Sequence, residues 1–147
     1  MNGVNGDWSA RLRAVAQRPS DVWREDLAEE TAELAAGILD PDDADLAELF
    51  PESLLTGTDQ ALAAFEQEVQ ALAPSSDSDV LQAVQLVMLA LNAVNNDHDG
   101  AAYETDEREM LCAYIDETLV EAGVDVRALE LRQGLKPQTI GDKWRDW

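Results

Sequence analysis

The chain has 147 residues, of which 46% are hydrophobic, so it can bury one core and is not globally disordered. Its 31 acidic residues outnumber 10 basic ones, and the net charge of −21 excludes nucleic acids and anionic membranes as expected partners. The single cysteine excludes a disulfide within the chain. Because the N-terminus lacks a signal-peptide pattern and no run reaches the roughly 20 apolar residues of a membrane span, we expect one cytoplasmic domain over residues 1–147.

The acidic residues are concentrated in the middle of the chain. Of the 31, 21 lie between Glu25 and Glu107, a stretch without Lys or Arg, whereas the flanks carry equal numbers of acids and bases. This block would attract a basic protein partner and speed its association. The alternative is that it only keeps the protein soluble. The residues expected to contact the partner are Glu29, Glu30, Glu33, Asp42, Asp43, Asp45 and Glu48.

In the first third of the chain, residues 1–7 are expected to be loose. A short basic helix over residues 9–17 then lies on the acidic middle, and Pro19 ends it. The next helix has an apolar stripe from Trp23 to Ile38, and a short helix over residues 42–50 follows it. These spacings predict helices that each present one apolar face to a common core.

In the rest of the chain, Thr58 is expected to cap a helix whose apolar stripe is Leu62–Leu72. The following helix, over about residues 79–95, is apolar almost all round, which predicts that other helices surround it. Thr105 is expected to cap a further helix that ends at Gly123.

The fold class predicted from these elements is all-α. We expect a single-domain bundle of about five to seven helices around the buried central helix (about 79–95), with the C-terminal tail (136–147) packed on it. Trp8, Trp144 and Trp147 lie near the chain ends, where they either pin the termini to the bundle or form part of a partner surface.

The loop after the central helix has a spacing typical of a calcium site. When Gly100 is aligned with the glycine of an EF-hand loop, the metal-ligand positions fall on Asn95, Asp97, Asp99 and Asp106. This segment therefore resembles an EF-hand, which implies a weak calcium-binding helical module as the alternative function. It departs from the motif because Asn replaces the first Asp and Asp106 is shorter than the usual Glu. An ordinary acidic interhelical loop explains the same residues.

Catalytic residues are not indicated. His98 and Cys112 are the single His and the single Cys, and no motif supports a nucleophilic pair between them. Cys112 is expected to be a half-buried small hydrophobic side chain. We therefore expect a non-enzymatic protein without a cofactor, calcium excepted.

The second half of the chain carries a resemblance to a group of proteins. The run ALNAVNNDHDGAAYETDEREMLCAYIDETLVEAGVD and the ending KWRDW resemble uncharacterised small acidic proteins of high-GC actinobacteria. That resemblance implies no activity. Size, acidity and helix content are also similar to immunity proteins that neutralise basic bacterial toxins, which is a likeness of type and not of motif.

Overall fold

The computed structural model describes residues 17–72 and 76–147, which form helices and turns without strands. The elements are α2 (Pro19–Ala35), the 3-10 turn η1 (Pro41–Asp43), α3 (Leu46–Leu49), α4 (Glu52–Gln70), α5 (Asp77–Asp97), α6 (Thr105–Glu121) and α7 (Val126–Arg132). The predicted all-α, single-domain fold is confirmed. None of the described helices is long and apolar enough to span a membrane. Some expectations concern residues outside the described ranges: those for residues 1–7, for Trp8 and for the helix over 9–17, of which only Gln17 is described.

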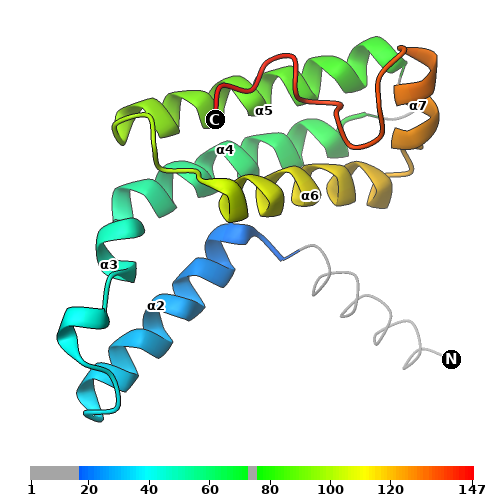
Figure 1. Ribbon diagram of the computed structural model, residues 1–147. Coiled ribbons are helices and arrows are strands. Elements are labelled where there is room, and N and C mark those ends of the chain that lie inside the picture. Colours follow the sequence, from blue (N-terminus) through cyan, green and yellow to red (C-terminus); the bar gives the residue numbers. More distant parts are fainter. Residues whose placement is uncertain (1–16, 73–75) are drawn as a thin grey trace, which may run out of the picture.

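Three long helices form the body of the bundle. α4, α5 and α6 run side by side, and α2 leans away from them, joined back to α4 through α3 (Figure 1). α4 and α5 make the most extensive helix–helix interface. Gly57 permits their close approach, because a Cβ atom there would lie 3.2 Å from both γ-carbons of Val94. The core sits between these helices and beneath the C-terminal tail.

The central helix α5 is buried along one face, which corrects the expectation that it is surrounded. Leu86 and Leu89 on its outer side are 48% and 46% exposed. Its buried residues recur at helical spacing: Val80, Ala83, Val84, Val87, Met88, Leu91, Asn92 and Asn95. An apolar run of this length therefore supplies both an inward face and an exposed apolar stripe.

Helix α4 begins six residues before the expected cap. Its first residue is Glu52, directly after Pro51, whose fixed φ and missing N–H suit a helix start. Thr58 is buried inside the helix, and its Oγ1 donates to the carbonyl of Leu54 at 2.8 Å. The Thr58 hydroxyl therefore accepts from the Tyr103 hydroxyl. The cap-like residue is in fact a buried contact between α4 and the loop before α6.

The region between α2 and α4 is less regular than expected. α2 ends at Ala35, and Ile38 is 77% exposed, so it does not continue the apolar stripe. Gly37, at φ +72°, turns the chain away from the core. The expected helix over residues 42–50 is divided into η1 and α3. Trp23 is in the core as predicted, and its ring stacks on Phe50 with 5.1 Å between centroids.

The C-terminal tail lies along α5 (Figure 1). Asn92 holds it, because its Nδ2 donates to the carbonyl of Trp144 at 2.7 Å and its Oδ1 accepts a backbone N–H of the tail at 3.0 Å. The Trp147 ring meets Tyr103 edge-on, with 5.2 Å between centroids. Both terminal tryptophans are partly buried against the core, so they pin the tail to the bundle.

Candidate functional site

An open cleft of about 670 Å³ lies between α2, α3 and the loop that joins α5 to α6. Its seven carboxylate residues are Asp26, Glu48, Asp97, Asp99, Glu104, Asp106 and Glu107. Its large apolar residues are Trp23, Leu46, Leu49, Phe50, Leu54 and Met110. Leu49 is 52% exposed, so an apolar side chain is available to a ligand at this site. The cleft thus combines an acidic rim with apolar surface.

The cleft joins residues that the sequence assigns to two separate sites. Glu48 belongs to the acidic block expected to bind a partner. Asp97, Asp99 and Asp106 belong to the EF-hand-like loop, and they line the same cleft. Sequence spacing could not reveal this proximity, because it depends on how α3 packs against the loop.

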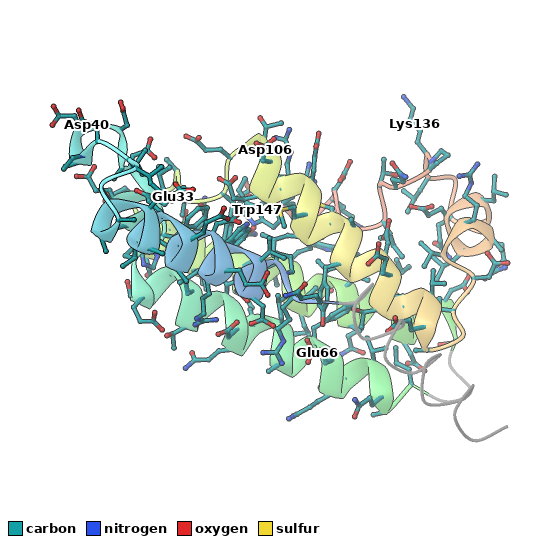
Figure 2. The ribbon with its side chains drawn as sticks, turned by 90° about the horizontal axis from the view of Figure 1, so that it is seen from below. Glu33, Asp40, Glu66, Asp106, Lys136 and Trp147 are labelled. Atoms are coloured by element: carbon teal, nitrogen blue, oxygen red, sulfur yellow. The ribbon has the colours of Figure 1, made fainter. Side chains whose placement is uncertain are left out.

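A second hollow, of about 430 Å³, lies between α2 and the η1–α3 segment. It collects five of the residues expected to contact a partner: Glu29, Glu30, Glu33, Asp43 and Asp45. It shares Asp26 and Leu46 with the cleft, so the two hollows form one continuous acidic surface. Asp42 is exposed on η1 but lines neither hollow. Glu33 and Asp40 lie at one end of the molecule, and Lys136 lies towards the other (Figure 2).

Glu30 is largely buried, whereas a residue expected to contact a partner would be exposed. It is only 8% exposed. Its carboxylate accepts the backbone N–H of Leu46, with Oε2 at 3.2 Å and Oε1 at 3.4 Å. A half-buried N–H at the start of a short helix needs such an acceptor. Glu30 therefore fastens α3 to α2 and shapes the acidic surface from behind.

Four of the described arginines pair with acids away from the cleft. The ion pairs are Arg18–Asp59, Arg18–Glu66, Arg24–Asp21, Arg24–Glu52, Arg24–Asp59, Arg132–Asp77 and Arg145–Asp142. Among the residues that the structure describes, no Lys or Arg forms an ion pair with any of the seven cleft carboxylates. The cleft therefore keeps a concentrated negative potential, which is strongest in a concave, partly apolar site.

A partly buried ion pair secures the start of α2 to α4 and α6. The Arg18 guanidinium makes two parallel hydrogen bonds to Glu66, at 2.8 and 2.7 Å. The Tyr114 hydroxyl donates to the same carboxylate. Partial burial by itself raises the pKa of Glu66, but the hydrogen bonds from Arg18 and Tyr114 outweigh it and hold that pKa below its ordinary value.

Asn95 closes the loop that forms one wall of the cleft. Its side chain is 2% exposed, and its Oδ1 accepts the backbone N–H groups of Ala102 at 2.8 Å and Tyr103 at 3.1 Å. Between Asn95 and Ala102 the chain reverses its direction through Asp99 and Gly100, whose φ angles are +68° and +72°. The side-chain oxygen of Asn95, which was expected to bind calcium, is thus committed to the loop itself.

The four residues expected to bind calcium are not gathered around one point. α5 continues through Asn95 to Asp97, whereas Asp106 lies in the first turn of α6. In residues 17–72 and 76–147, no group of three or more His, Cys, Asp or Glu side chains is arranged to hold a metal ion. Calcium binding stays a prediction, and it requires this loop to rearrange.

A pair of glutamates caps α6 at the edge of the cleft, which corrects the expected Thr105 cap. Glu104 is the N-cap, and its carboxylate accepts the backbone N–H of Glu107. The Glu107 carboxylate in turn accepts the N–H of Glu104 at 3.3 Å. Glu rarely serves as an N-cap, so residue preferences favour the neighbouring Thr. Two of the seven cleft carboxylates are therefore held in place by the helix start.

A Ser–His pair beside the cleft was not anticipated from the sequence. His98 Nδ1 lies 2.8 Å from the carbonyl of Val94, so this nitrogen carries a proton and donates. His98 Nε2 lies 2.9 Å from Ser53 Oγ. The pair ties the end of α5 to the start of α4. Although its geometry is that of a nucleophile and base, the nearby carboxylates would oppose the negative charge of an oxyanion.

Cys112 lies in a different hollow from His98, so the structure does not bring the two together. Its thiol is half-buried and lies 3.2 Å from Nη1 of Arg145. Burial raises the pKa of the Cys112 thiol, which reduces its nucleophilicity at neutral pH.

No family model, curated protein or solved structure matches the chain.

Proposed function

We propose that the protein is a non-enzymatic acidic interaction protein whose cleft binds a basic segment of a protein partner. The observation that supports this most is the cleft itself, with seven carboxylates that form no ion pair with a described Lys or Arg. Elsewhere, the two arginines at the start of α2 are each paired with a carboxylate of α4, Arg18 with Glu66 and Arg24 with Asp59. A solubilising surface would not need a concave site whose negative charge is left unmatched.

The lining of the cleft indicates the kind of segment that fits. Arg is the best match for the rim, because its planar guanidinium binds carboxylates through two parallel hydrogen bonds. Leu49, and Met110 at the edge of the cleft, offer apolar contact to an aromatic or aliphatic side chain of the partner. We therefore infer a segment with one apolar anchor flanked by arginines. Neutralisation of a basic toxin, as immunity proteins do, is one biological setting for such binding.

The experiment is to map binding of a basic probe by NMR. The probe is a short synthetic peptide with one Trp flanked by arginines, titrated into the full chain at about 50 mM salt, where the Debye length exceeds 10 Å. Shift changes are expected to concentrate at residues 97–107 and in α3. Changes spread evenly over all acidic faces, or none, would refute the proposal.

A further inference from the structure

The chain contains a segment with the chemistry that the cleft selects. Residues 8–13, WSARLR, carry an aromatic side chain, a leucine and two arginines, and they lie in the part of the chain that the structure does not describe. We infer that this segment binds the acidic cleft of its own molecule and that a basic partner must displace it. The inference rests on the proposed function, since it assigns an occupant to the same site.

The segment is tethered close to the cleft. Gln17, the first described residue, donates through Nε2 to Glu25 on α2 at 2.9 Å. The next residue, Arg18, binds Glu66, which also accepts from Tyr114 on α6. Met110 at the edge of the cleft is one helical turn before Tyr114 on the same helix. A tether of a few residues, at roughly 3.5 Å per residue, can therefore reach the cleft.

Charge complementarity supports this occupant. Ten Lys and Arg residues occur in the chain, and Arg11 and Arg13 are the two that lie outside the described residues. The other eight form no ion pair with the cleft carboxylates. Trp8 and Leu12 provide the apolar anchors that Leu49 can accept. The same six residues thus supply both kinds of contact that the cleft offers.

Such binding has a measurable consequence for a partner. A short tether gives an effective concentration of about 1 mM, so contacts with an intrinsic Kd of about 0.1 mM keep the cleft occupied about nine-tenths of the time. When an internal segment occupies a site about nine-tenths of the time, the apparent Kd of a competitor rises about tenfold. The segment would then restrict the cleft to partners that bind more tightly than it does.

The first test compares full-length variants in calorimetric titrations with the Trp–Arg probe peptide. The Arg11→Gln, Arg13→Gln variant is expected to bind the probe about tenfold more tightly than the wild type. The matched control is Arg127→Gln, Lys136→Gln, which makes the same change in net charge at exposed positions in α7 and after it. Equal affinity of both variants would overturn the inference while leaving the proposed function intact.

The second test locates the segment directly in the full chain. A spin label is attached to Ser9→Cys in a Cys112→Ala background, and NMR signal broadening is measured. Signals of residues 98–107 are expected to broaden at about 50 mM salt and to recover at about 1 M, where the Debye length is about 3 Å. Absence of this broadening overturns the inference even if the probe binds. Failure of every form to bind the probe instead refutes the proposed function.

Discussion

Replacing Asn95 by Ala should destabilise the protein by about 2–3 kcal/mol, because the loop at the cleft depends on one side-chain oxygen. The substitution removes the acceptor of two backbone N–H groups, those of Ala102 and Tyr103. A buried donor without a partner costs about 1–3 kcal/mol. Tyr103 is 5% exposed and should incur most of that cost, whereas water can partly reach Ala102, which is half-buried.

Thermal unfolding followed by far-UV circular dichroism measures this loss. For a chain of this size, 1 kcal/mol corresponds to about 3–4 °C in Tm, so Asn95→Ala should lower Tm by roughly 6–12 °C. Asn95→Asp keeps an acceptor at the same place but puts a carboxylate at a position that is 2% exposed, so it should recover only part of the lost stability. The control is Asn96→Ala, at an exposed neighbouring position of the same helix. If Asn95→Ala lost no more stability than this control, the account of the loop would be wrong.

The same melts test the calcium hypothesis. Because Oδ1 of Asn95 is committed to the loop, the wild type should show no rise in Tm when calcium replaces a chelator. A ligand at about 100 times its Kd would add about 2.7 kcal/mol and a shift of several degrees. Such a shift, lost in an Asp97→Ala, Asp99→Ala variant, would show that the loop opens to bind calcium.

Three further predictions concern the body of the bundle. Burial, together with nearby carboxylates, raises the pKa of Asp116 to about 6, so folding becomes less favourable as pH rises from about 4 to 6. After allowance for solvent screening, Asp116→Asn should raise the free energy of unfolding by about 1 kcal/mol at pH 7.5 and leave it unchanged near pH 3, as measured by guanidinium unfolding. The pKa of Glu66 is lower in the folded protein than in the unfolded chain, so its contribution to stability is present above the unfolded pKa and is lost as pH falls through the folded pKa. Arg18→Met should therefore cost about 1 kcal/mol of stability at pH 7 and less in acid, and an equal cost at both pH values would contradict this. A Cβ at Gly141 would lie 2.2 Å from Cε of the buried Met88, so Gly141→Ala should cost about 1–3 kcal/mol in the same assay, and an unchanged midpoint would show that this contact yields freely.

Helical periodicity was sufficient to predict the fold class and much of the core. The positions of Leu62 and Phe65 on α4, and of Leu111 and Ile115 on α6, recur at helical spacing, and all four are buried. Trp23 is in the core as well. These features were predictable because the spacing of apolar residues along one helix is a local property of the sequence.

The departures from prediction arise where tertiary contacts decide. Thr58 has the chemistry of an N-cap, but its hydroxyl is used by Tyr103, 45 residues later in the chain. Asn95 has the chemistry of a calcium ligand, but its oxygen closes a turn instead. In both cases the residue type permits two roles, and only packing selects between them.

The cleft was only half predictable for the same reason. The acidic block and the acidic loop are each evident from the residues, yet Glu48 and Asp106 are far apart in the chain. Their meeting depends on the stacking of Trp23 on Phe50, which positions α3 opposite the loop. Nor could residue type alone show that Glu30 is buried and holds α3 in place.

The most direct test of the central claim compares two double charge reversals in calorimetric titrations with the Trp–Arg probe peptide. Glu48→Lys, Asp106→Lys alters the cleft, whereas Glu68→Lys, Glu121→Lys makes the same change in net charge at exposed positions on α4 and α6 outside it. We expect an affinity at least about tenfold weaker for the cleft variant and less than about threefold weaker for the control, because contacts in the cleft are partly desolvated and the others are screened. Equal losses in the two variants would show that the probe senses only the net charge, and would contradict the account.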